Sequence, residues 1–187
     1  MDKTKFTFEL VDKHTPDIVI KNTLKQIEEA TRGYVVGKVE EYDGPIYSYT
    51  KKVGIAAALD SLQSASETVK VDIQDKLGEQ SDEKHRYEVF LTVKGLEHYK
   101  YRMMFVDYNA ISYPVTIVMN EKLAIEYSGR MNDTFCVDSM KDLEDMMNEV
   151  INSDTMVAFV QKLINESLRK ENMERDIVKD VKITDEN

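Results

Sequence analysis

The chain has 187 residues, of which 42% are hydrophobic and 32% are charged. This composition is too apolar for a chain that is disordered throughout, and the length suits one globular domain. The 35 acidic residues outnumber the 25 basic ones and give a formal net charge of −10, which argues against direct binding to nucleic acid or to anionic membranes.

The first elements along the chain are a strand and a well-marked helix. Apolar and polar residues alternate over 6–11, which predicts a half-buried strand. Thr15 at the N-cap and Pro16 at the first helical position predict the start of a helix. Apolar residues recur at helical spacing after it, and Gly33 is a typical residue to end it.

A hairpin and a second helix are expected next. The turn-forming residues 43–45 separate two strand-like segments, 34–42 and 46–51, which predicts a hairpin. Residues 54–66 have helical periodicity. Residues 67–77 fit either a continued helix or a strand, and their β-branched residues favour a strand from about residue 68.

The middle of the chain is the most strand-like part. Residues 85–93 and 99–108 alternate around a turn, and Pro114 allows a third strand over 115–119. Residues 120–129 fit a short helix or another strand.

Two helices are predicted near the C-terminus. The extended residues 135–137 lead to Ser139 and Asp142, which resemble a capping box. A helix follows that points Leu143, Met146, Met147, Val150 and Ile151 inward. A polar break at 152–154 starts a second helix, so the pair is expected to form a helical hairpin on the sheet.

Together these elements predict an α+β fold. It comprises an antiparallel β-sheet of about five to seven strands, two helices in the N-terminal half and a C-terminal helical hairpin. We expect residues 1–169 to form a single domain and residues 170–187, which are dense in charge, to form a C-terminal tail.

The single cysteine, Cys136, bears on the cellular compartment of the protein and is also a candidate nucleophile. It cannot form an internal disulfide, and the polar first residues do not resemble a secretion signal, so we expect a cytoplasmic protein. Cys136 with a histidine, oriented by Asp138 or Asp107, is the one nucleophilic arrangement available. Its apolar neighbours favour the alternative, a small buried hydrophobic residue.

The sequence predicts no cofactor and no metal. His14, His85 and His98 are isolated, and neither zinc nor calcium spacing occurs. The glycines form no phosphate-binding motif.

A locally basic segment, 84–102, raises the question of nucleic-acid binding. Its basic residues are interleaved with tyrosines, namely Lys84, Arg86, Lys94, Lys100 and Arg102 with Tyr87, Tyr99 and Tyr101. Exposed aromatic rings on a sheet can stack on bases. The overall negative charge favours an ordinary sheet with lysines along its edges, so we expect no direct contact with nucleic acid.

Acidic residues are concentrated in two stretches, 67–83 and 138–154. The candidate partner-binding residues are Asp72, Asp75, Glu79, Asp82 and Glu83 in the first, and Asp138, Asp142, Glu144, Asp145, Glu149 and Asp154 in the second. Carboxylates on a rigid surface can imitate a line of phosphates and occupy a basic cleft. The ordinary alternative is an acidic surface that maintains solubility.

Methionines also gather near the C-terminus, at Met140, Met146, Met147 and Met156. Met is used both to fill gaps in a core and to form adaptable binding surfaces. The first use is commoner, and we expect it here.

The leading hypothesis is a non-enzymatic binding protein or inhibitor that presents carboxylates to a basic protein partner, such as a nuclease or another nucleic-acid-binding protein. The size, the acidity and the preference for lysine over arginine suit an anti-CRISPR-like protein of a phage or mobile element in a low-GC bacterium. The alternatives are a self-associating structural or assembly subunit and an enzyme of unrecognised type. The sequence does not define the oligomeric state.

Overall fold

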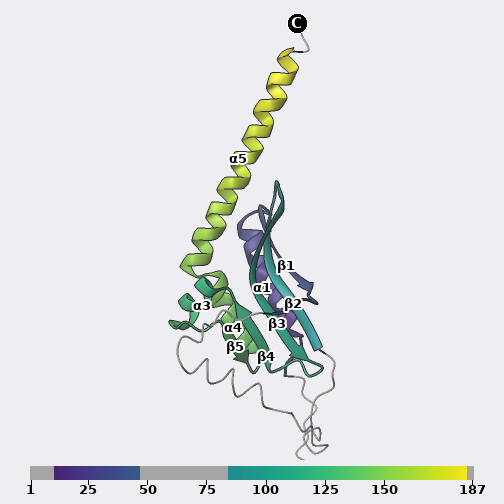
Figure 1. Ribbon diagram of the computed structural model, residues 1–187, viewed down its shortest axis with the longest axis vertical. Helices are drawn as coiled ribbons and strands as arrows, with labels where there is room; N and C mark the ends of the chain where they lie inside the picture. Colours follow the sequence, from purple (N-terminus) through teal and green to yellow (C-terminus); the bar gives the residue numbers. More distant parts are fainter. Residues whose placement is uncertain (1–10, 47–83, 185–187) are drawn as a thin grey trace, which may run out of the picture.

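The computed structural model describes residues 11–46 and 84–184, which form an α+β fold. One antiparallel sheet has the strand order β1-β2-β3-β4-β5, so neighbours in space are also neighbours in sequence. The strands are β1 (Val35–Glu41), β2 (Lys84–Val93), β3 (Leu96–Asn109), β4 (Val115–Met119) and β5 (Thr134–Val137). The helices are α1 (Pro16–Ala30), α3 (Glu121–Ser128), α4 (Met140–Ile151) and α5 (Asp154–Thr184) (Figure 1). The predicted fold class is confirmed.

Helix α1 begins and ends where its sequence signals indicate. Thr15 is the N-cap residue and Pro16 is the first helical residue, although the Thr15 side chain makes no capping hydrogen bond. The helix ends at Thr31, and Arg32 and Gly33 then have φ values of 52° and 78°, in the left-handed region. Its apolar side chains enter the core; they are Val19, Ile20, Leu24 and Ile27.

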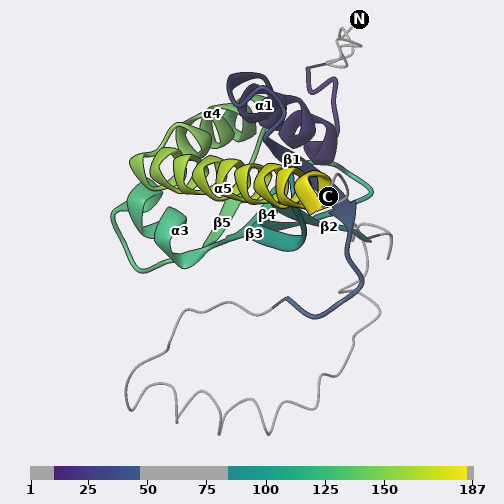
Figure 2. The ribbon, with the colours of Figure 1, turned by 90° about the horizontal axis from the view of Figure 1, so that it is seen from above.

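The sheet has one covered face and one face opposite the helices. Seen from above, α1, α4 and α5 lie on the same side of the sheet (Figure 2). In β1 and β2, Val35 pairs with Val93 and Gly37 pairs with Leu91, and these residues face α1. The residues between them, such as Lys38 and Phe90, therefore face the other way.

The three strands predicted in the middle of the chain are confirmed as β2, β3 and β4. Gly95 has a φ of 78° and closes the turn between β2 and β3. The alternatives for 120–129 resolve in favour of a helix, α3. The Asn120 side chain accepts a hydrogen bond from the Lys122 backbone N–H, and Gly129 ends the helix in the left-handed conformation.

The two predicted C-terminal helices are α4 and α5, separated by Asn152 and Ser153. Ser139 caps α4 as expected: its hydroxyl oxygen accepts a hydrogen bond from the Asp142 N–H at 3.2 Å. The five residues predicted to point inward from α4 are all buried.

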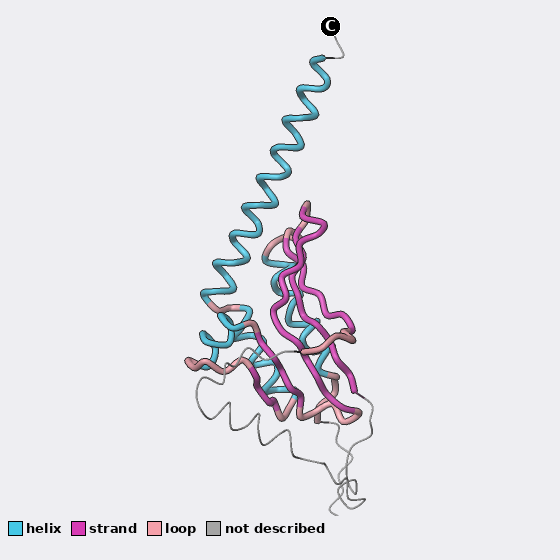
Figure 3. Tube along the Cα trace, in the orientation of Figure 1, coloured by secondary structure: helices cyan, strands magenta, loops and turns pink. Residues whose placement is uncertain are grey.

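Helix α5 is longer than predicted and includes most of the predicted tail. It continues past Lys170 to Thr184 and extends beyond the rest of the fold (Figures 1 and 3). Ser167 is buried against the turn between β2 and β3, where its hydroxyl donates a 2.7 Å hydrogen bond to the Lys94 carbonyl. Lys170 donates in the same way to the Gly95 carbonyl.

Several predictions fall outside the described residues. They are the strand at 6–11, the hairpin partner of β1 at 46–51, the helix at 54–66 and the alternatives for 67–77. The strand that pairs with β1 among the described residues is β2, in antiparallel register.

Candidate acidic binding groove

The acidic residues predicted to bind a partner form two stretches, and the structure describes only the second. Asp72, Asp75, Glu79, Asp82 and Glu83 lie outside the described residues. In the second stretch, Glu144 is half-buried and the other five side chains are exposed. Asp138 follows β5, Asp154 begins α5, and the other four residues of this stretch lie on α4.

Helix α4 does not present all its carboxylates on one side. Asp142, Asp145 and Glu149 are separated by three and four residues, which places them along one side of the helix. Glu144 lies on a different side of the helix, and its charge adds to the effect of burial in raising the pKa of Tyr113. The four acidic residues of α4 are therefore divided, with three on one side of the helix and one on another.

Two cavities lie beside these carboxylates, and they share one residue, Tyr127. The first, which we call the edge groove, has a volume of about 430 Å³. The second, which we call the junction pocket, has a volume of about 370 Å³. The edge groove is lined by residues 134–138 of β5 and its exit together with Tyr127, Asn132, Asp142 and Met146. The junction pocket is lined by Leu123, Glu126, Tyr127, Glu149, Val150, Asn152, Ser153 and Asp154.

Tyr127 is held at this shared position by contact with β5. Its ring meets the Phe135 ring edge-on, with centroids 5.3 Å apart and an interplanar angle of 83°. Burial raises the pKa of the Tyr127 hydroxyl, and the charges of Glu149 and Asp142 raise it further. The two carboxylates therefore act on the same phenol from the two cavities.

Glu126 adds a carboxylate that the sequence did not single out. Its two oxygens accept hydrogen bonds from the backbone N–H groups of Asp154 at 2.7 Å and Thr155 at 3.0 Å. The hydrogen bonds from Thr155 and Asp154 lower the pKa of the Glu126 carboxyl. This carboxylate stays ionised in mildly acidic solution and adds to the charge of the junction pocket.

The carboxylates of the two cavities have no basic partner within residues 11–46 and 84–184. None of Asp138, Asp142, Asp145, Glu149 and Asp154 forms an ion pair there. The Asp142 carboxylate accepts a hydrogen bond from the Ser139 hydroxyl at 2.6 Å, not from a cation. An unpaired charge on an accessible surface keeps its capacity to attract an opposite charge.

The basic segment on β2 and β3 is different, because most of its cations pair with carboxylates. Arg86 pairs with Asp107 at 3.1 Å. Lys100 and Arg102 both pair with Glu88, whose side chain is only 8% exposed. Three cations thus share two carboxylates, so the pairs reduce the positive charge that this segment offers to phosphates.

The tyrosines of the basic segment do not form an open stacking platform. Tyr87 lies against the Tyr108 ring at a centroid distance of 6.0 Å, and Tyr101 lies against Phe159 at 4.0 Å. Both are packed against the hydrophobic core. The arrangement resembles an ordinary sheet whose aromatic residues face its helices.

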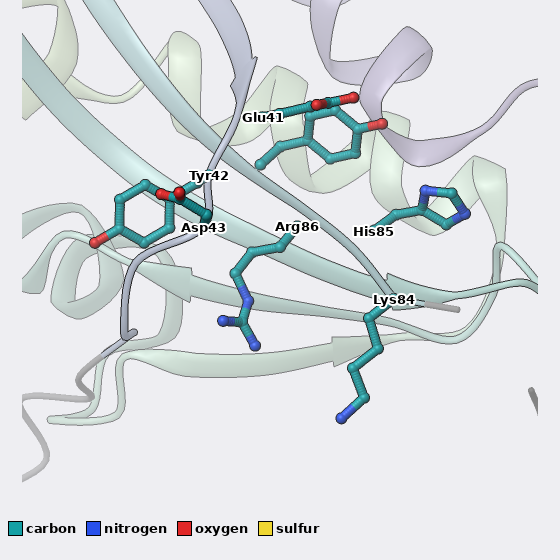
Figure 4. A pocket seen from close by; sticks show the side chains of 7 residues that line it. Glu41, Tyr42, Asp43, Lys84, His85 and Arg86 are labelled. Atoms are coloured by element: carbon teal, nitrogen blue, oxygen red, sulfur yellow. The ribbon is translucent and has the colours of Figure 1, made fainter. Parts of the chain in front are cut away.

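A third cavity, of about 690 Å³, lies at the ends of β1 and β2 (Figure 4). Lys84 and Arg86 extend from β2, and Glu41 and Asp43 come from the end of β1 (Figure 4). Arg86 is held by Asp107 and donates to the Gly44 carbonyl at 3.2 Å. Charges of both signs meet here, so this cavity has no strong preference for a ligand of one charge.

Cys136 is exposed, so the interpretation of it as a small buried residue is wrong. It lies on β5 between Phe135 and Val137, which face the core, and the alternation of a strand turns Cys136 to the opposite face. Asp138 shares the edge groove with it, but no histidine is among the described residues that line this groove. The arrangement needed for a nucleophilic cysteine is not assembled around this groove.

The methionine prediction is confirmed. Met146, Met147 and Met156 are buried, and Met140 packs against the core. Within the described part of the chain, no group of three or more His, Cys, Asp or Glu side chains is placed to hold a metal ion.

Comparison with protein-family models, with curated proteins and with solved structures finds no match for this chain. Among the helices at 11–46 and 84–184, none has both the length and the apolar character that crossing a bilayer requires.

Proposed function

We propose that this chain is a non-enzymatic binding protein that presents the edge groove and the junction pocket to a basic protein partner. The observation that supports this is the clustering of Asp138, Asp142, Glu149 and Asp154 around Tyr127, with no cation paired to any of them in the described structure. Unpaired carboxylates beside an aromatic ring suit lysine and arginine, which combine a charge with an apolar stem.

The class of partner follows from the same charges. Basic clefts that bind phosphates are common in nucleases and other nucleic-acid-binding proteins, and a rigid row of carboxylates competes for such clefts. An inhibitor of this kind acts where its target acts, so we place the protein in the cytoplasm. An anti-defence protein of a phage or mobile element is the biological setting that fits the proposal.

The experiment is affinity capture on the immobilised chain from its native cell, followed by mass spectrometry of the retained proteins. We expect a basic protein that elutes as salt is raised, because exposed charge pairs are screened. The triple variant Asp138→Asn, Asp142→Asn, Glu149→Gln is expected not to retain this basic protein.

The matched control removes three exposed carboxylates elsewhere, with Glu28→Gln, Glu29→Gln and Glu40→Gln. It changes the net charge by the same amount and is expected to retain the partner. Equal loss in the two variants would mean that only net charge matters, which contradicts a dedicated site. Retention in both would exclude the carboxylates as determinants.

A second candidate function, a self-associating assembly subunit, is favoured by helix α5. Beyond Glu171, which pairs with Lys94 at 2.9 Å, the helix extends away from the sheet (Figure 1). Met173 on this outer part is 66% exposed. Light scattering in the micromolar range separates the two functions, since a monomer argues against assembly.

A further inference from the structure

Strand β5 is an edge of the described sheet, and its outward backbone groups can be identified. The Met119 N–H donates to the Asp133 carbonyl at 2.7 Å. In an antiparallel ladder, alternate residues bond to the neighbouring strand, so residues 133, 135 and 137 face β4. The N–H and C=O groups of Thr134 and Cys136 therefore point away from the sheet.

One end of this edge is already occupied by a side chain. The Asn132 amide donates to the Thr134 carbonyl at 2.9 Å, and its oxygen accepts from the Thr134 N–H at 3.4 Å. An amide side chain here imitates the first residue of a pairing strand. The next outward groups, those of Cys136, have no such partner among the described residues.

The edge is recessed, which distinguishes it from an ordinary sheet edge. All residues from 134 to 138 line the edge groove, together with Tyr127 of α3 and Asp142 and Met146 of α4. Proteins usually discourage pairing at a sheet edge with short strands, charged side chains, proline or a covering element. Here residues of two helices border the edge, and the groove has a volume of about 430 Å³.

The charge of the groove selects the occupant. A second copy pairing through its own β5 would add a second set of Asp138 and Asp142 carboxylates to an edge that is already acidic. Like charges across a strand pair are destabilising. A segment with lysine or arginine places its cations beside these two carboxylates instead.

We propose that an extended, lysine- or arginine-bearing segment of the partner adds to β5 as a sixth strand within the edge groove. This inference rests on the proposed function and specifies how the basic partner is held. Backbone hydrogen bonds at Cys136 supply the affinity, and Asp138 and Asp142 supply the preference for basic side chains.

The first test uses a fluorescent peptide of alternating lysine and threonine residues as the probe, with binding followed by anisotropy. Its control has the same residues with N-methyl groups on alternate amides, which keeps the charge but removes strand pairing. We expect the methylated peptide to bind at least about tenfold more weakly, the effect of roughly one or two hydrogen bonds.

The second test changes the edge itself. Cys136→Pro removes the outward N–H without removing a bond to β4, because the Cys136 N–H does not belong to that ladder. We expect it to weaken binding of the unmethylated peptide to the level of the methylated one. Cys136→Val keeps the N–H and is expected to bind as the unmodified chain does.

A measurement on the unmodified chain does not depend on how the proline variant folds. Hydrogen exchange at the Cys136 amide is expected to slow when the unmethylated peptide binds and to stay unchanged with the methylated one. Equal binding of both peptides, or unchanged exchange at Cys136, would overturn strand addition.

The outcomes also separate this inference from the proposed function. If both peptides bind equally and Asp138→Asn with Asp142→Asn weakens both, the acidic site stands and strand addition is wrong. If neither peptide binds, strand addition is overturned while the capture experiment decides the proposed function independently. A dimer that competes with the peptide would identify a second copy as the occupant and overturn the proposal.

Discussion

The carboxylate of Glu126, in the last turn of α3, accepts a 2.7 Å hydrogen bond from the backbone N–H of Asp154, the first residue of α5. Its second oxygen accepts from the Thr155 N–H. The first N–H groups of a helix lack partners within the helix, and the positive end of its dipole attracts an anion. A side chain 28 residues earlier in the chain thus caps the longest helix of the fold.

Replacing Glu126 by glutamine is expected to lower the thermal unfolding temperature. Glutamine keeps one acceptor oxygen but loses the charge that the helix dipole favours. The pKa of Glu126 is lowered from its usual 4.5, so the carboxylate stabilises the fold above that pH and loses this effect as pH falls through the lowered value. Thermal melts between neutral pH and pH 3 by circular dichroism would measure both effects.

Glu97→Gln is the matched control, because Glu97 is an exposed residue just after the β2–β3 turn. It should melt as the unmodified protein does at each pH. A Glu126→Gln protein with the same melting temperature and the same acid sensitivity as this control would contradict the capping role.

Glu88 is a buried acid that depends on two cations. Burial raises the pKa of its carboxyl, but the hydrogen bonds and charges of Lys100 and Arg102 outweigh this effect, and the pKa is lowered overall. Glu88→Ala leaves both cations without their carboxylate. We expect a loss of about 1 to 3 kcal/mol in the free energy of unfolding, measured by urea denaturation.

The partial exposure of the cations keeps this cost below that of breaking a fully buried pair, since Lys100 and Arg102 are 37% and 44% exposed. Glu40, which pairs opposite Glu88 in the sheet but is itself exposed, supplies the control Glu40→Ala. An equal and small effect at both positions would show that the cluster around Glu88 adds little stability.

Local patterns were sufficient to predict most of the described fold. Period-two alternation located β2, β3 and β4, and capping residues located α1 and α4, because these signals act within a few residues. The same alternation shows why the buried interpretation of Cys136 was wrong: Phe135 and Val137 face the core, so the residue between them faces outward. Apolar neighbours on both sides of a strand residue therefore indicate an outward-facing side chain.

The candidate site was predicted only in part. Asp138, Asp142 and Glu149 could be singled out because acidic residues cluster along the sequence. Glu126 and Tyr127 could not, because their role depends on where α3 lies relative to β5 and α5, and residues 120–129 fitted both a helix and a strand. Tertiary placement, which no short pattern encodes, brings them to the groove.

Gly37 shows a further consequence of tertiary placement, the close approach of α1 to β1. A Cβ atom added at Gly37 would lie 2.7 Å from the Cβ of Leu24 and 3.0 Å from both of its δ-carbons. Because the nearest atom is attached directly to the α1 backbone, a rotation of the Leu24 side chain cannot relieve the contact. Helix α1 would have to move away from the sheet.

The Gly37→Ala variant tests this contact by whether it raises or lowers stability. If the contact with Leu24 were absent, alanine in a strand would raise the free energy of unfolding by roughly 0.5 to 1 kcal/mol over glycine, because glycine loses more conformational freedom on folding. If the contact is present, overpacking is expected to cost about 1 to 3 kcal/mol, so the free energy of unfolding should fall. Urea denaturation measures the sign directly. The control is Lys38→Ala, at the exposed neighbouring position, which is expected to change stability little. A Gly37→Ala protein more stable than the parent would show that Leu24 of α1 is not in close contact with β1 at this position.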